Sequence, residues 1–187
     1  MQILLAASSV ELEYVKRGFL VKGGISLGRF FHDENIVFGE ALSKSASLEE
    51  THSEPNIVIE EQLISVFIDS ANKLDLGLTD ESLGRTFKYS ADNEYSFLHY
   101  LYMATYSKQI SIPNYISDGS DTLEEHRKGL EKAIRRSMDS MNSSVALKYL
   151  WAIEYHNDTT QSDRDDLRIP GSIKKPVLLR AISYPEP

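Results

Sequence analysis

The segment 21–50 limits the possible folds more than any other part of the chain. It reads VKGGISLGRFFHDENIVFGEALSKSASLEE, in which a glycine-containing apolar run, a polar turn, a second apolar run and an amphipathic stretch follow one another. This order predicts a strand over 19–27, a turn over 28–35, a strand over 36–38 and a helix over 40–52.

The pattern continues beyond this segment with a predicted strand over 56–59 and a helix over 60–71. Alternating strands and helices are typical of a mixed α/β sheet, so we expect an α/β (α+β) fold with flanking helices. Gly23 and Gly24 are adjacent inside a predicted strand, which indicates close approach of another backbone or of a ligand.

The N-terminal segment and a later region of the chain are predicted to be helical. Residues 1–17 form an amphipathic pattern, and 122–141 and 143–156 predict a C-terminal pair of helices. The stripe expected to face the core of the first helix consists of Ile3, Ala7, Val10 and Tyr14, widened by Leu4, Leu5, Leu12 and Val15.

The middle of the chain and its end are less regular. Residues 72–93 are predicted to be a loop with one strand over 85–89, and over 94–106 the helix and strand patterns compete. Residues after 157 are polar or lack periodicity, which predicts a mobile tail. The expected domain organisation is 1–72 as a half-domain, 73–160 as an extension that ends in two helices, and 161–187 as the tail.

Composition excludes several classes of function. The net charge of −8 argues against a general nucleic-acid binder, because neutralising phosphates requires clustered Lys and Arg. The chain has no Cys, so disulfides and thiolate chemistry are excluded. No apolar run approaches the ~20 residues of a membrane span. We therefore expect a cytoplasmic protein that binds neither nucleic acid nor membrane.

The histidines do not show the spacing of a metal site, and no HExxH pattern occurs. His32 and Asp33 are expected to lie in a surface turn. His156 and Asp158 are expected to cap a helix end and to be solvated. The sequence therefore predicts no metal site made by this chain alone.

Several short motifs follow one another along the chain. They are KGGIS at 22–26 with Gly28, HD at 32–33, FGEAL at 38–42, LE at 48–49, KYLW at 148–151 and YHN at 155–157. In this order and spacing the motifs resemble the C-terminal half of a class III nucleotidyl cyclase domain. They are most similar to the bacterial Pycsar-type cyclases, which make cyclic pyrimidine nucleotides in antiphage defence.

This resemblance implies a partial cyclase-like sheet and an enzyme that converts a nucleoside triphosphate to a 3′,5′-cyclic nucleotide and pyrophosphate. It also implies a homodimer and two ions of Mg or Mn, which such enzymes hold with two aspartates. Both aspartates would lie upstream of Met1, so no catalytic residue is identified in this chain. Activity would then require a complementary N-terminal polypeptide.

The resemblance also marks candidate nucleotide-binding residues. Ser43 and Ser47 stand where the general family pattern has an Asn and an Arg, and Lys22 stands where an Arg is usual. Lys keeps the charge but loses the bidentate fork of Arg. The full candidate set is Lys22, Gly24, Ser26, Gly39, Ser43 and Ser47. Packing and turning explain the glycines better than phosphate binding does, and a solvated lysine at a strand end is the alternative for Lys22.

A second interpretation is that the chain is a non-catalytic cyclase remnant, and therefore a regulatory or interaction subunit. The absent first strands and the serines at positions 43 and 47 favour it. Such a protein would present an unpaired strand edge and would dimerise or bind a complementary chain.

Overall fold

The computed structural model describes residues 2–75, 77, 79–90, 94–106, 119–137, 142–160 and 162–169, and it divides the chain into two compact units. Residues 21–99 form the sheet unit. Residues 1–20 and 100–187 together form the helical unit, so the sheet unit is inserted between the first helix and the remainder of the helical unit. This division does not coincide with the expected boundaries at residues 72 and 160.

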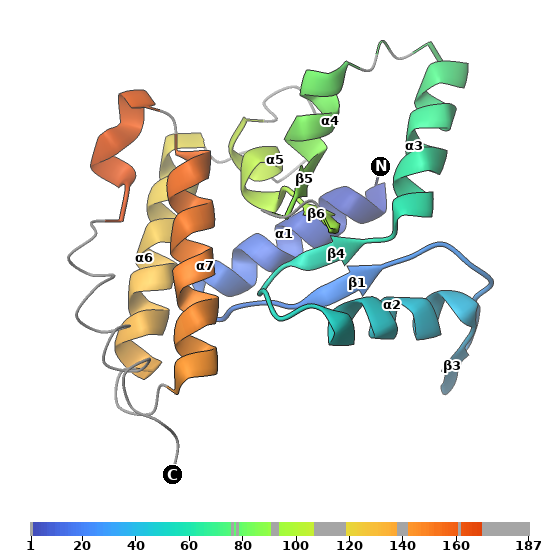
Figure 1. Cartoon of the computed structure of the whole chain (residues 1–187), viewed down its shortest axis with the longest axis horizontal. Helices are drawn as coiled ribbons and strands as arrows, with labels where there is room; N and C mark the ends of the chain where they lie inside the picture. Colours follow the sequence, from blue (N-terminus) through green and yellow to red (C-terminus); the bar gives the residue numbers. More distant parts are fainter. Residues whose placement is uncertain are drawn as a thin grey trace. The chain divides into compact units, whose positions relative to one another are not determined.

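The sheet unit is built on a four-stranded mixed sheet of order β1-β4-β6-β5 (Figure 1). Strand β1 (Gly23–Ile25) is parallel to β4 (Ile57–Ile59). Strand β6 (Ser96–Leu98) is antiparallel both to β4 and to β5 (Phe87–Tyr89). The expected mixed α/β fold is therefore confirmed.

Three helices belong to this unit. Helix α2 (Glu40–Thr51) packs on β1 and β4, as Figure 1 shows. Helix α3 (Glu61–Lys73) follows β4, and the ring of its Phe67 meets Phe87 edge-on at 5.6 Å. Helix α4 (Asp80–Thr86) lies where a loop was predicted.

Helix α4 begins at a reciprocal cap. The backbone N–H of Ser82 donates to Thr79 Oγ1, and the backbone N–H of Thr79 donates to Ser82 Oγ, both at 3.1 Å. A Thr-x-x-Ser cap satisfies two backbone donors of the first turn, which explains how a short polar stretch becomes helical.

The expected turn over 28–35 contains part of a separate two-stranded hairpin. Strand β2 (Phe31–Asp33) pairs antiparallel with β3 (Ile36–Phe38), and Phe31 is opposite Phe38. All six residues of the two strands are exposed, and neither strand is paired with the four-stranded sheet.

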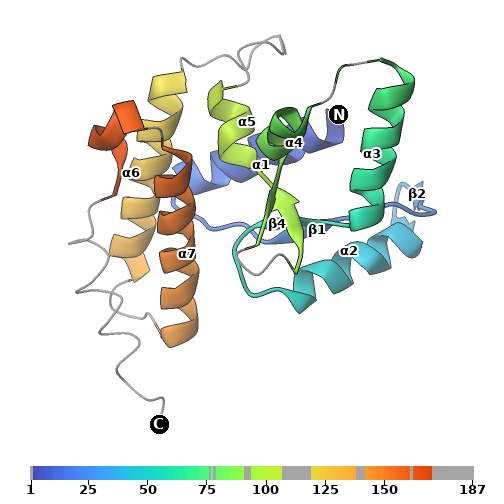
Figure 2. The same cartoon turned by 45° about the horizontal axis from the view of Figure 1, so that its top comes forward.

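The helical unit contains α1 (Gln2–Lys16), α5 (Tyr100–Tyr106), α6 (Gly119–Ser137) and α7 (Ser143–Thr159), followed by the short 3₁₀ helix η1 (Ser162–Leu167). Helix α1 packs on α5 and α6, and Figures 1 and 2 both show α6 and α7 side by side. The residues that fill the core of the helical unit include Leu4, Leu12, Val15, Leu101, Leu123, Leu130, Ile134 and Ile153.

The predicted inward stripe of α1 is wrong for three of its members. Ile3, Val10 and Tyr14 are exposed, whereas Leu4, Ser8, Glu11, Leu12 and Val15 are buried. The reason is a close helix crossing that a single-helix pattern does not reveal. A Cβ added at Gly129 of α6 would meet the backbone of Val15 and Lys16, so this glycine brings α6 against one particular face of α1.

The predicted tail is also wrong for its first part. Leu167 and Ile169 are buried, and the side chain of Asn157 accepts from the backbone N–H of Ile169 at 2.8 Å. The same amide donates to the carbonyl of Ile169 at 3.3 Å. The segment up to Ile169 is therefore part of the helical unit, and the remainder of the expected tail lies outside the described residues.

Within the described residues, no helix combines the length and the apolar character that crossing a bilayer would require.

Candidate functional site

Strand β1 is an edge of its sheet in the part of the chain that the structure describes. On one side, the N–H of Gly23 donates to Asn56 at 3.1 Å and the carbonyl of Ile25 accepts from Glu60 at 2.9 Å. Because backbone groups alternate along a strand, the N–H and C=O of Gly24 point to the other side, where no strand is paired. Such an edge can accept an added strand.

Gly24 of the KGGIS motif and the nearby Gly28 have a packing role. A Cβ at Gly24 would meet the backbone oxygen of Ser45, and it would lie 2.9 Å from the Cβ of Leu48. A Cβ at Gly28 would lie 2.9 Å from the backbone nitrogen of Ala41. Both glycines therefore let α2 lie directly on the segment that contains β1, which explains their presence without a ligand.

The structure divides the predicted nucleotide-binding residues into two groups of three. Lys22 forms an ion pair with Glu49 of α2 at 3.0 Å. Ser26 Oγ donates to the carbonyl of Ala41 at 2.6 Å and lies 2.9 Å from Ser45 Oγ. Lys22, Gly24 and Ser26 therefore contact the inner face of α2.

The other three candidates belong to α2 or precede it. Gly39 is the N-cap residue of α2 with φ of 148°, a conformation that favours glycine. Ser43 and Ser47 lie one turn apart on the exposed face of α2, so they do not meet the residues beneath the helix. The described geometry therefore brings Lys22, Gly24 and Ser26 together, but it does not gather all six residues around one phosphate-sized site.

A small group of ion pairs and hydrogen bonds, which was not predicted from the sequence, joins the end of β1 to α2 and to the end of β4. Lys44 forms ion pairs with Glu40 at 3.0 Å and Glu60 at 3.1 Å. Glu60 also accepts from the backbone N–H of Leu27 at 2.7 Å. Hydrogen bonds from Lys44 to Glu40 and Glu60 raise the pKa of Lys44, and the Leu27 hydrogen bond lowers the pKa of Glu60.

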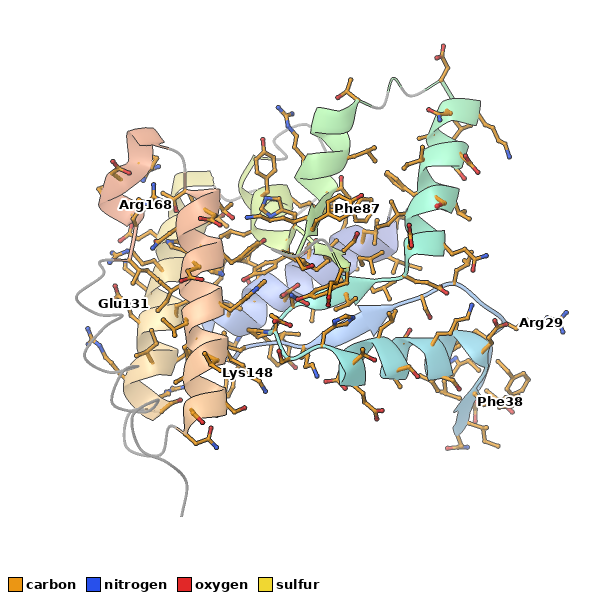
Figure 3. The ribbon with its side chains drawn as sticks, viewed as in Figure 1. Arg29, Phe38, Phe87, Glu131, Lys148 and Arg168 are labelled. Atoms are coloured by element: carbon orange, nitrogen blue, oxygen red, sulfur yellow. The ribbon has the colours of Figure 1, made fainter. Side chains whose placement is uncertain are left out.

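The hairpin presents an apolar surface, which we call the hairpin surface. It consists of Phe30, Phe31, Ile36, Val37 and Phe38, each 45% to 59% exposed. The rings of Phe31 and Phe38 stack at 4.8 Å. Figure 3 shows Phe38 and Arg29 at the hairpin end of the sheet unit, with the Arg29 side chain directed away from the ribbon. Because side chains alternate along a strand, Phe31, Ile36 and Phe38 lie on one face of the hairpin and Val37 lies on the other. An exposed apolar face such as the first is typical of an interaction site.

The prediction for one histidine of the helical unit is wrong. His156 is fully buried rather than a solvated cap, and its Nδ1 lies 3.0 Å from Nδ1 of His126, which is buried as well. A signal was present for His126, because it follows Leu123 by three residues and precedes Leu130 by four, on the buried face of α6. The sequence alone did not show that the two rings would meet.

The described residues do not fit the two metal ions that the cyclase resemblance implies. No group of three or more histidines and carboxylates among them is arranged to hold a metal ion.

Comparison with known proteins gives no relative: no protein-family model, no curated protein and no solved structure matches this chain. The likeness to class III cyclases therefore rests on the motifs and the order of the elements alone.

Proposed function

We propose that this chain is an interaction protein that assembles with a second copy of itself through the hairpin surface. The observation that carries the proposal is the exposure of Phe31, Ile36 and Phe38 on an isolated two-stranded hairpin. A single hairpin is at best marginally stable in water, and it gains stability when a further strand or another apolar surface covers it.

A second copy is the occupant that this surface fits best. A two-fold contact needs one self-complementary patch, and most soluble homo-oligomers are two-fold dimers. The hairpin surface includes the stacked rings of Phe31 and Phe38, and Arg29, Asp33 and Glu34 occur in the same stretch of chain. Both signs of charge are therefore present near the hairpin. Attraction between opposite charges can then offset repulsion between like charges when two copies meet.

Light scattering coupled to size-exclusion chromatography tests this proposal. We expect the purified chain to be a dimer, and the double variant Phe31→Ser/Phe38→Ser to dissociate at least about tenfold more readily, since burying each Phe contributes roughly 1.5–3 kcal/mol. Leu147→Ser is the matched control, because Leu147 is 58% exposed but lies on α7 of the helical unit. A wild-type chain that is monomeric at every concentration would contradict the proposal.

A second candidate function is that of a nucleotidyl cyclase-like half-domain that needs a complementary polypeptide. In its favour, β1, β3, α2 and β4 follow one another in the order that the cyclase resemblance implies, although β2 forms where that order has a turn. The unpaired side of β1 is the place where a strand of such a polypeptide would add. On this proposal the substrate is a nucleoside triphosphate, the ions are Mg or Mn, and the product would act in antiphage signalling.

Incubation with ATP, GTP, CTP and UTP plus Mn, read by mass spectrometry, tests the second candidate. We expect no cyclic nucleotide from this chain alone, because its described part holds no suitable metal ligands. Mixed with a complementary polypeptide that supplies the two metal-binding aspartates, it should yield a cyclic product. Failure of the mixture both to bind and to convert any of the four triphosphates would eliminate the cyclase proposal and leave the interaction proposal untouched.

A further inference from the structure

A column of hydrogen-bonded polar side chains runs through the core of the helical unit. The hydroxyl of Tyr100 on α5 lies 2.6 Å from His126 Nε2 on α6. His126 Nδ1 lies 3.0 Å from His156 Nδ1 on α7, and His156 Nε2 lies 2.9 Å from the carbonyl oxygen of Leu167 at the end of η1. All three side chains are buried, so this column joins four elements of the unit without access to water.

The proton on each nitrogen follows from one end of the column. A carbonyl oxygen only accepts, so His156 carries its hydrogen on Nε2 and, when neutral, accepts at Nδ1. His126 must then donate from Nδ1, which leaves its Nε2 as an acceptor for the hydroxyl of Tyr100. Every donor in the column is used once, and both rings are neutral.

One additional proton changes the role of Tyr100. If either ring becomes charged, the two Nδ1 atoms still share one hydrogen, but His126 Nε2 then carries a hydrogen and Tyr100 must accept it. The hydroxyl hydrogen of Tyr100 then needs another acceptor. Glu11 of α1 is fully buried, and neither of its carboxyl oxygens has a hydrogen-bond partner among the described residues. When ionised, Glu11 acts on both Tyr100 and Tyr155.

A second proton breaks the column. With both rings charged, the two Nδ1–H groups would face each other at the 3.0 Å that now separates the nitrogens. Two donors and two positive charges cannot remain at that distance in a buried site. We propose that this column is a proton-operated latch, which holds α5, α6 and α7 together while both histidines are neutral and opens the helical unit in acid.

The surrounding charges keep the closed state neutral. The groups that act on the column are Glu11 and Lys16 of α1, Arg127 and Glu131 of α6, Tyr155 of α7 and Arg168 after η1. Desolvation lowers the pKa of both histidines, and the field of Lys16 lowers the pKa of His126 further. Burial also raises the pKa of Glu11, the buried carboxyl group of α1.

The direction of the pH effect follows from these shifts. A histidine whose pKa is lower in the fold than in the unfolded chain contributes stability above its ordinary pKa of 6.5, and that stability is lost as the pH falls below it. As the pH falls in that range, each such histidine increases the opening equilibrium constant by up to about tenfold per pH unit, and two together by up to about a hundredfold.

The first test is a two-bond ¹H–¹⁵N correlation spectrum of the full chain at pH 7.5. We expect His156 to carry its proton on Nε2 and His126 to carry its proton on Nδ1, which is the less common form of free histidine. The exposed ring of His32 serves as the internal reference. A proton on Nε2 of His126 instead of Nδ1, or a charged ring at either position, would overturn the proposal.

The second test is amide hydrogen exchange of the full chain between pH 7.5 and 5, corrected for intrinsic rates. We expect the opening constant of α6 and α7 to rise steeply below pH 6.5, and His126→Asn/His156→Gln to flatten that slope, whereas His32→Gln should not. Peptides from the sheet unit are read separately, because burial lowers the pKa of His99 there to about 3. An unchanged opening constant in the wild type, or an equal slope in the double variant, would refute the latch.

Discussion

At the scale of single residues, two glycines differ in what a methyl group would meet. Gly129 of α6 faces the backbone of Val15 and Lys16, whereas nothing lies within 4 Å of a Cβ added at Gly84 of α4. We expect Gly129→Ala to lower the free energy of opening of α6 by about 1–3 kcal/mol through overpacking. Gly84→Ala should instead stabilise α4 by about 0.4–1 kcal/mol, because alanine restricts the unfolded chain.

Amide hydrogen exchange of α4 and α6 measures both effects in the same experiment. Equal and small effects at the two positions would show that α1 and α6 do not approach as closely as the structure has them.

Glu11 is the second informative residue. Its carboxyl group is fully buried without a hydrogen-bond partner, and burial raises its pKa. A raised pKa means that its stability contribution is present below its ordinary value of 4.5 and is lost as the pH rises toward the folded value. We therefore expect Glu11→Leu to stabilise the helical unit by about 1–3 kcal/mol at pH 8, and by less at pH 5.

Urea unfolding followed by helix-specific probes at the two pH values checks this prediction. Glu13→Leu is the control on the same helix, since Glu13 is partly exposed and pairs with Lys16 and Arg17 at 3.3 and 2.9 Å. Loss of stability at both pH values in Glu11→Leu would mean that the carboxyl group has a stabilising role that its lack of partners does not reveal.

At the scale of elements, the start of α7 depends on one side chain. Asn142 is its N-cap, and Asn142 Oδ1 accepts from the backbone N–H of Val145 at 2.9 Å. Replacing an N-cap Asn by Ala typically costs about 1 kcal/mol. We expect Asn142→Ala to lower the free energy of opening of the first turn of α7 by this amount. Asn142→Asp should leave that free energy unchanged, because Asp is also a good N-cap. An unchanged first turn in the alanine variant would assign the start of α7 to packing instead of capping.

Elements with a strong local signal were predicted well. Helices α1, α2, α3, α6 and α7 and strands β1, β3, β4 and β5 all overlap their predicted ranges, because periodicity and punctuating glycines are local properties. The competing patterns over 94–106 became a strand and then a helix, β6 and α5. Helix α4 was not predicted because it is marked by its N-terminal cap and not by a helical repeat of apolar residues.

At the scale of the whole molecule, the helical unit is discontinuous in sequence. Helix α1 packs on α5 and α6, although the entire sheet unit separates them along the chain. Long-range partners of this kind contribute packing that no local segment replaces. We expect a chain that starts at residue 21 to lose protection in α5 and α6, while β4 and β6 retain theirs.

Hydrogen exchange of the truncated chain against the full chain checks this expectation, and the near-ultraviolet signal of Trp151 on α7 gives a second measure. Full protection of α6 in the truncated chain would show that α1 is dispensable for the helical unit.

The sequence alone determined the mixed α/β class and most helices, because composition, periodicity and turn residues act over a few neighbours. It also marked the segment 21–50, where the structure places an unpaired strand edge and the hairpin surface. Only the tertiary structure decided which face of α1 is buried, that Lys22 pairs with Glu49, and that His126 meets His156. These outcomes depend on helix crossings between distant segments, and such crossings leave no periodic signal in either segment by itself.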